Sequence, residues 1–306
     1  MKLQRNFLIW LSIALALFCC HSKILSAEPL PELPPDFNIG FYYPPIQNLV
    51  SRNDFEASLT VWIEEITQKI KSIPIKIELF DTIEAMRKAF DQGELAIIVG
   101  PPYILAKYFD RNSLADGLTG TTPQGKPNGL IMLVRNNKHI DSVNQLRGKR
   151  LVMPTENELA DVFLDTLTLK TYRQPFQKIF GSIRSLPSYS SLVYEVFFDR
   201  ADVTLTYQET YDVMQELNPQ LSSTLTVLTD YPFKAPNYGY FHKRYPDDLR
   251  KLWIENAIRL ENSPKAKQVL LNLKMGGFTV CPVDALAPFD QLAEDHYKAK
   301  HGGTKP

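Results

Sequence analysis

The chain has 306 residues, enough for two ordinary domains or one large one, each with its own hydrophobic core. Hydrophobic residues make up 44% and charged residues 22%, as in an average globular protein, which argues against a disordered, collagenous or polytopic membrane chain. Lysine plus arginine and aspartate plus glutamate are both 34, so net charge gives no reason to expect a nucleic-acid partner.

The amino terminus predicts a secretory signal peptide. Lys2 and Arg5 precede an apolar run at 7–20, and a polar segment ending in small residues follows. The apolar run is shorter than the roughly 20 residues that a membrane-spanning helix needs. We therefore expect a signal peptide at 1–27, cleavage after Ala27 and a periplasmic mature protein.

Two alternatives remain at this end of the chain: an uncleaved membrane anchor, and lipidation at Cys19 or Cys20. Removal of residues 1–27 takes away three cations and no acid, so the mature chain is mildly acidic. It also leaves a single cysteine, Cys281, which excludes an intrachain disulfide even in an oxidising compartment.

Strand and helix patterns alternate after the proline-rich segment 28–37. We expect strands at 37–43, 73–80 and 95–99 and helices at 59–70 and 82–90. This β-α-β-α-β order favours an α/β sheet with parallel strands and helices on its faces.

The pattern then restarts. We expect strands at 130–135, 150–153 and 202–206, a helical turn at 142–148, and helices at 156–169 and 189–198. A return strand at 238–242, helices at 246–261 and 264–273, and a frayed tail from Lys298 complete the chain. Two α/β units of similar size are the simplest interpretation.

The chain lacks the common catalytic and metal-binding motifs, among them H-E-x-x-H, C-x-x-C, G-x-S-x-G and the Walker lysine motif. The histidines are scattered and are interpreted as surface residues. Cys281 has no neighbouring histidine in the sequence and is predicted to be a small buried side chain. The sequence thus predicts no enzymatic activity, no metal site and no cofactor.

Four stretches together resemble the periplasmic substrate-binding proteins of phosphonate, phosphate and phosphite ABC transporters. The second is the most specific, because a strand ending in arginine, then I-x-S-x-x-x-L-x-G-K and another strand recur in that family. The stretches are TIEAMRKAFDQGELAIIVGPPYILA at 82–106, LIMLVRNNKHIDSVNQLRGKRLVMP at 130–154, SYSSLVYEVFFDRADVTLTY at 188–207 and PNYGYFHKRYPDDLRKLW at 236–253.

The resemblance implies a type II periplasmic-binding fold: two α/β lobes, each a mixed, mostly parallel sheet flanked by helices, joined by a two-strand hinge. Lobe one would comprise 28–129 plus 238–306, and lobe two 130–237. Such a protein closes on a small-molecule ligand and delivers it to a membrane transporter permease. We expect a monomer without nucleic-acid binding.

The family's ligand contacts fall on four loops of this sequence. In the family, the lobe-two helix begins with hydroxyl and glycine residues, whose backbone N–H groups and helix dipole hold an oxyanion. The matching positions are Tyr42, Tyr43, Gly100, Pro102, Tyr103, Thr155, Glu156, Asn157, Tyr189, Ser190 and Tyr207.

This sequence departs from the family at that helix. Thr155 and Glu158 fit a T-x-x-E capping box, which would satisfy the free N–H groups from within the chain, and Glu156 adds a second carboxylate that would repel a phosphonate. Tyr189 and Tyr207 stand where the family has compact polar residues. We therefore expect a larger, aromatic-lined cleft for an organic solute.

Other interpretations stay open. An oxyanion such as phosphonate or phosphate is the alternative ligand, and any of these tyrosines could belong to the core instead. Arg184 could meet an anion, although a solvated loop arginine is the simpler interpretation. In place of transport, the protein could be a ligand sensor docking on a receptor kinase, or an accessory protein that has lost ligand binding.

Overall fold

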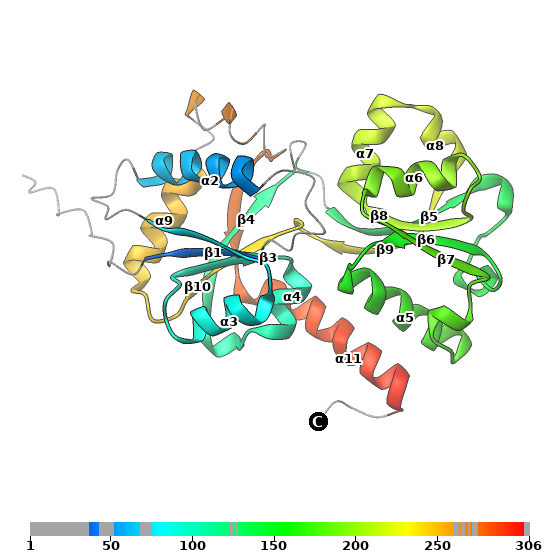
Figure 1. Ribbon diagram of the computed structural model, residues 1–306, viewed down its shortest axis with the longest axis horizontal. Helices are drawn as coiled ribbons and strands as arrows, with labels where there is room; N and C mark the ends of the chain where they lie inside the picture. Colours follow the sequence, from blue (N-terminus) through cyan, green and yellow to red (C-terminus); the bar gives the residue numbers. More distant parts are fainter. Residues whose placement is uncertain are drawn as a thin grey trace, which may run out of the picture. The chain divides into compact units, whose positions relative to one another are not determined.

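The computed structural model describes most of the chain after residue 36 (Figure 1). The described residues are 37–42, 52–67, 75–122, 125, 128–259, 263–264, 267–268, 270 and 275–302. The predicted signal peptide, nearly all of the proline-rich segment and Tyr43 lie outside them. Within these ranges, no helix combines the length and the apolar character needed to cross a bilayer.

Six strands form a mixed sheet in the order β11-β4-β10-β3-β1-β2. β1 runs parallel to β2 and β3, whereas β10 pairs antiparallel with β3 and β4, and β11 antiparallel with β4. β4 and β10 approach closely at Gly117, where a Cβ atom would lie 2.1 Å from the carbonyl oxygen of Gly239. The strands are β1 (Ile39–Tyr42), β2 (Ile77–Phe80), β3 (Ile97–Gly100), β4 (Leu114–Thr121), β10 (Tyr238–His242) and β11 (Gly277–Cys281).

Helices cover both faces of this sheet (Figure 1). Buried side chains of α2 and α9 pack on one face, and those of α3, α4 and α11 on the other. In α3, Ile83, Met86 and Phe90 recur at helical spacing and are buried, while the Thr82 side chain accepts a hydrogen bond from the N–H of Ala85. The helices are α2 (Arg52–Thr67), α3 (Ile83–Asp91), α4 (Pro102–Tyr108), α9 (Asp247–Arg259) and α11 (Ala287–His301).

Five strands form a second mixed sheet in the order β7-β6-β8-β5-β9. β6 runs parallel to β7 and β8, and β5 pairs antiparallel with β8 and β9. The strands are β5 (Asn128–Arg135), β6 (Arg150–Pro154), β7 (Ser182–Leu186), β8 (Val203–Tyr207) and β9 (Leu225–Phe233). The chain therefore passes between the sheets twice, from β4 to β5 and from β9 to β10.

The second sheet is also sandwiched between helices (Figure 1). Alternate residues of β5 point to opposite cores: Leu130 and Met132 join the core with α5, whereas Ile131 and Leu133 join that of α6 and α7. This is why the strand is apolar on both faces, with every residue from Asn128 to Val134 buried. The helices are α5 (Glu158–Tyr172), α6 (Tyr189–Phe197), α7 (Gln208–Leu217) and the short α8 (Gln220–Thr224).

The predicted α/β class is confirmed, and both sheets are mixed. The antiparallel pairs involve the strands that flank the two crossings between the sheets, which are β4, β5, β9 and β10, and the strand β11. The division into lobes at 129/130 and 237/238 stays a prediction.

The carboxyl-terminal helix α11 was not predicted. Residues from Lys298 onward were expected to be frayed, but α11 continues to His301 and ends where Gly302 adopts a φ of 74°. The helix packs against α5, and the Lys170 ammonium lies 2.6 Å from an Asp295 carboxylate oxygen. His296 was interpreted as a surface residue. It is instead half-buried, with Nε2 2.8 Å from Asp165 Oδ2.

Candidate functional site

The parallel strands of the two sheets end at residues that the sequence assigned to the ligand site. β1 and β3 end at Tyr42 and Gly100, β6 ends directly before Thr155, and β8 ends at Tyr207. Ligands of open α/β sheets bind at the carboxyl ends of such strands. The predicted contacts therefore lie at the edges where a ligand is expected.

Side chains from the two sheets' helices meet at this place. Lys107 of α4 forms an ion pair with Glu158 of α5. Burial raises the pKa of the Tyr42 hydroxyl, and the carboxylates of Glu84, Glu158 and Glu156 raise it further. Since Glu84 belongs to α3 whereas Glu156 and Glu158 stand at the start of α5, Tyr42 lies within electrostatic range of both sides. The ion pair between Lys107 and Glu158 joins α4 to the start of α5.

Asn157 is the centre of a hydrogen-bonded network at the start of α5. It is 7% exposed, and its Oδ1 accepts the N–H of Ala160, which caps the helix. Its Nδ2 donates to the hydroxyl oxygens of Tyr189 and Tyr207, at 2.8 and 3.0 Å. Both amide hydrogens are used within the protein. Asn157 therefore holds the two tyrosines in place and has no amide hydrogen left for a ligand.

The predicted capping box at Thr155 and Glu158 is wrong. Glu156 adopts a left-handed conformation, with a φ of 50°, which turns the chain before the helix can begin. Helix α5 therefore starts two residues later than expected, at Glu158, and Asn157 becomes its N-cap. The Glu158 carboxylate pairs with Lys107 instead of reaching back to a backbone N–H group. Thr155 is half-buried, and its N–H donates to the carbonyl of Leu186 at 3.0 Å.

The first turns of α5 carry negative charge. Glu158 and Asp161 both lie near the positive end of the helix dipole, where carboxylates are stabilised. Asp161 is half-buried, and burial together with the neighbouring Glu158 and Asp165 raises its pKa. These carboxylates stand in the first turns of the helix at which an oxyanion was expected from the family resemblance, and Lys107 is paired with Glu158.

Tyr189 and Tyr207 lie against the start of α5, and Tyr42 and Tyr103 belong to the first sheet and its helix α4. The Tyr189 and Tyr207 rings lie 4.7 Å apart between centroids, and burial raises the pKa of both hydroxyls, so they are neutral donors and acceptors at neutral pH. Burial also raises the pKa of Tyr103 to about 12. Tyr103 is 4% exposed and Tyr42 is half-buried. The tyrosines are therefore set firmly into the structure and offer a mixed aromatic and hydroxyl surface.

The remaining predicted contacts take simpler roles. Pro102 is buried at the first position of α4, where a missing N–H costs no hydrogen bond. Ser190 is exposed, and its hydroxyl lies 3.0 Å from that of Ser188, the N-cap of α6. Glu156 is exposed. Tyr43 lies outside the described residues.

Sequence reasoning missed an aromatic run that continues from Tyr207. Its ring contacts Phe233 at 6.0 Å, Phe233 contacts Phe289 at 5.7 Å, and Phe289 contacts Tyr238 at 6.2 Å. These residues come from β8, β9, α11 and β10, so the run passes beside the crossing between the sheets. Because neither β9 nor α11 was predicted, the sequence offered no signal that these rings meet.

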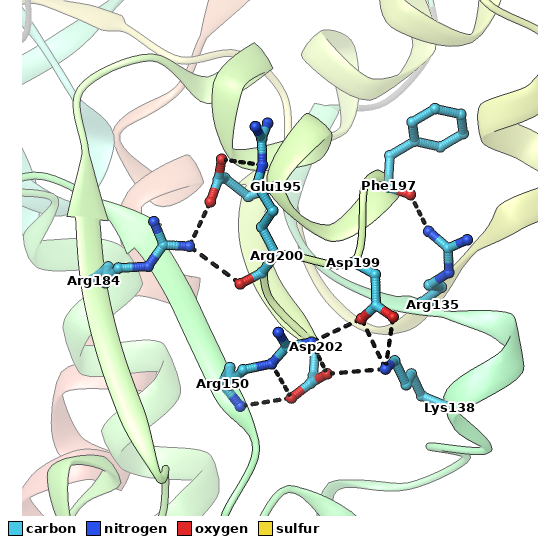
Figure 2. Close-up of polar contacts among 9 residues, drawn as sticks. All are labelled: Arg135, Lys138, Arg150, Arg184, Glu195, Phe197, Asp199, Arg200 and Asp202. Atoms are coloured by element: carbon cyan, nitrogen blue, oxygen red, sulfur yellow. Dashed lines mark hydrogen bonds and ion pairs between the residues drawn. The ribbon is translucent and has the colours of Figure 1, made fainter.

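Arg184 and Cys281 also have defined positions. Arg184 was interpreted as a solvated loop residue. It is exposed, but it lies on β7 and not in a loop, and it forms an ion pair with Glu195, which also pairs with Arg200 at 2.9 Å (Figure 2). The predicted burial of Cys281 is confirmed. Its sulfur lies 3.2 Å from the Tyr240 hydroxyl, and burial raises its pKa to about 11, so the thiol is protonated at neutral pH.

One family of known proteins matches most of the chain. The family model of periplasmic substrate-binding proteins of phosphonate ABC transporters matches residues 50–284. No curated protein sequence matches the chain.

Three solved structures illustrate the fold. XAC2383 from Xanthomonas citri, bound to ATP, has a TM-score of 0.62 and 13% identity over 86% of this chain and 98% of its own. PhnD1 from Prochlorococcus marinus, in complex with methylphosphonate, has a TM-score of 0.60 and 12% identity over 87% and 100%. A binding protein of an ABC phosphonate transporter from Pseudomonas aeruginosa has a TM-score of 0.58 and 14% identity over 88% of each chain. At these identities the likeness establishes the fold.

Proposed function

Because the chain belongs to the periplasmic substrate-binding family of phosphonate ABC transporters, it is a solute-binding protein, and we propose that its ligand is an uncharged organic solute carrying a hydroxyl group or a ring. The ligand is held between Tyr42 and Tyr103 on one side and Tyr189 and Tyr207 on the other. Closure of the two lobes, 28–129 plus 238–306 and 130–237, encloses it for delivery to a membrane permease.

The network around Asn157 carries this proposal. An oxyanion site at the start of α5 needs free donors and a positive potential. Here Asn157 has used both amide hydrogens on Tyr189 and Tyr207, and the first turns of the helix carry Glu158 and Asp161. A unit negative charge about 4 Å from such a carboxylate is disfavoured by about 4 kcal/mol at an effective dielectric near 20. A neutral ligand avoids this repulsion.

The tyrosines supply what a neutral organic ligand requires. Their rings give apolar contact area, and their hydroxyls, neutral because their pKa values are raised, can donate to or accept from a ligand hydroxyl or carbonyl group. Within this proposal the protein is a non-catalytic monomer, exported after cleavage near Ala27.

A thermal-shift screen of the exported protein tests the ligand class. The panel contains phosphate, phosphite and methylphosphonate on one side and uncharged hydroxylated or aromatic solutes on the other. A ligand at about 100 times its dissociation constant stabilises the folded protein by about 2.7 kcal/mol, which raises the melting temperature measurably. We expect a response to one or more neutral solutes. A response confined to the oxyanions would overturn the proposal and favour the family's ligand class.

A further inference from the structure

Two segments of the second α/β unit contain no acidic residue at all. Residues 142–155 and 166–194 carry lysines and arginines but neither aspartate nor glutamate, in a chain whose total charges balance. Both segments pass the edge of the sheet where β6 and β7 begin, at Arg150 and Ser182. This edge lies at the opposite ends of the strands from the proposed ligand site.

Backbone and side-chain hydrogen bonds hold the two segments together. The N–H of Gly148 donates to the carbonyl of Ile179 at 2.7 Å, and the N–H of Gly181 donates to the carbonyl of Lys149 at 2.9 Å. The Tyr172 hydroxyl accepts the N–H of Leu146 and donates to the carbonyl of Val143, at 3.0 and 2.6 Å. The cations of these segments are therefore presented together on an ordered surface.

Four of these cations form what we call the basic corner: Arg147, Lys149, Arg173 and Lys178. Arg147, Arg173 and Lys178 are exposed, and Lys149 is half-buried. The Arg147 guanidinium lies 5.0 Å from the centre of the Tyr172 ring and donates to Gln174 Oε1 at 3.3 Å. Across the part of the chain that the structure describes, no acidic side chain pairs with any of the four.

The neighbouring cations, unlike those of the basic corner, form ion pairs, which Figure 2 shows. Arg150 and Lys138 share the carboxylates of Asp199 and Asp202, with Arg150 Nη2 2.7 Å from Asp199 and 2.8 Å from Asp202. Arg184 pairs with Glu195. These side chains form ion pairs at the edge of the sheet, whereas the cations of the basic corner form none among the described residues.

An exposed aromatic ring follows α6 at the same end of the second sheet. Phe198 is 58% exposed and precedes Asp199, which has a left-handed φ of 59° and accepts a hydrogen bond from Arg150. The Phe198 ring lies 5.0 Å from that of Phe197 and 5.3 Å from the Arg200 guanidinium. An exposed ring among arginines and lysines is the composition of protein surfaces that rest at the headgroup level of a bilayer.

We propose that the basic corner and Phe198 form a docking surface for an anionic phospholipid bilayer. Charge complementarity selects an anionic partner, and the exposed ring favours a lipid interface over a purely polar one. Contact at this edge leaves the opposite, ligand-binding edge accessible. A solute-binding protein held at the membrane searches for its permease in two dimensions, which raises its local concentration there.

Vesicle flotation tests this surface. Exported protein, purified from the periplasmic fraction, is mixed with phosphatidylcholine vesicles with or without about 30% phosphatidylglycerol, at low and high salt. We expect binding only to the anionic vesicles, weakened at high salt by screening. Neutralisation of the basic corner by Arg147→Gln, Lys149→Gln, Arg173→Gln and Lys178→Gln together is expected to lower the partition coefficient by about six hundredfold, since each such cation contributes roughly fivefold.

A matched control has the same change of net charge elsewhere. Lys88, Lys243, Lys251 and Lys267 are exposed and lie outside the second sheet, and none forms an ion pair among the described residues. Their combined replacement by glutamine should leave vesicle binding within about threefold of wild type, because only charges near the leaflet contribute. For the aromatic part, Phe198→Ser should weaken binding, whereas Leu217→Ser, at a position 80% exposed, should not.

Three results would overturn the proposal. They are equal binding to vesicles with and without phosphatidylglycerol, equal losses in the basic-corner and control variants, and binding to polyglutamate without binding to vesicles. The last result would assign the surface to an acidic protein partner. Unchanged melting temperatures of the variants exclude unfolding as the cause of a loss.

Discussion

Replacement of Asn157 by alanine tests the network on which the proposed ligand class depends. The substitution removes the N-cap bond to Ala160 and the bonds to Tyr189 and Tyr207. Loss of an N-cap costs about 1 kcal/mol, and each further hydrogen bond contributes about 1 kcal/mol when it is buried. Because one N-cap bond and two hydrogen bonds to tyrosine hydroxyls are lost together, we expect the free energy of unfolding to fall by about 2 to 3 kcal/mol.

Urea unfolding, followed by both fluorescence and circular dichroism, measures this change. Ser188→Ala is the matched control, because Ser188 caps α6 through one long bond of 3.4 Å to the N–H of Ser191 and bridges no tyrosines. It should cost about 1 kcal/mol or less. Asn157→Asp keeps the cap and can accept hydrogen bonds from the tyrosine hydroxyls, so it should fall between wild type and Asn157→Ala. If Asn157→Ala costs no more than Ser188→Ala, the network does not hold the tyrosines in place.

Two further predictions concern the ligand and the charged cluster of Figure 2. Tyr207→Phe keeps the ring and removes the hydroxyl, so it should weaken binding of the ligand found in the screen by about fivefold to tenfold; an unchanged dissociation constant by calorimetry would exclude Tyr207 as a hydrogen-bonding contact. Burial alone would raise the pKa of Asp202, but hydrogen bonds from Arg150 outweigh it and hold the pKa below the ordinary value of 3.8. A lowered pKa stabilises the fold above the ordinary value, and this contribution is lost as the pH falls through the lowered one. Asp202→Asn should therefore destabilise the protein by about 2 kcal/mol at pH 7 and by much less at pH 3; equal effects at both pH values in urea unfolding would contradict this.

The fold was largely predictable because the buried strands carry clear patterns. Apolar runs such as 130–135 predicted strands, and helical spacing of apolar residues predicted α3 and α6. The strands that were missed are β4, β7, β9 and β11. Two of them show why: β7 (SIRSL) has no fully buried residue, and β4 (LADGLTGT) contains two glycines and an aspartate. These segments are strands because they pair with adjacent strands of the sheet, and the local sequence pattern carries no information on that pairing.

The sequence predicted residues that lie at the carboxyl ends of the strands, but not the structural roles of those residues. The expected helix start failed at Glu156, because a left-handed glutamate is uncommon and no local rule indicates one. That turn made Asn157 the cap and freed Glu158 to pair with Lys107, 51 positions earlier in the chain. The preference for a neutral ligand stays a prediction, and it depends on the Asn157 network and the paired Glu158 instead of the capping box.

The proposed function requires that the site at the start of α5 binds a neutral organic ligand in place of an oxyanion. Calorimetric titration of methylphosphonate into the exported protein tests it most directly. Without a free donor set at the start of α5, we expect a dissociation constant no tighter than about 1 mM, or about −4 kcal/mol. A dissociation constant near 1 µM, about −8 kcal/mol, would contradict the proposed ligand class and show that the start of α5 binds an oxyanion despite Glu158 and Asp161.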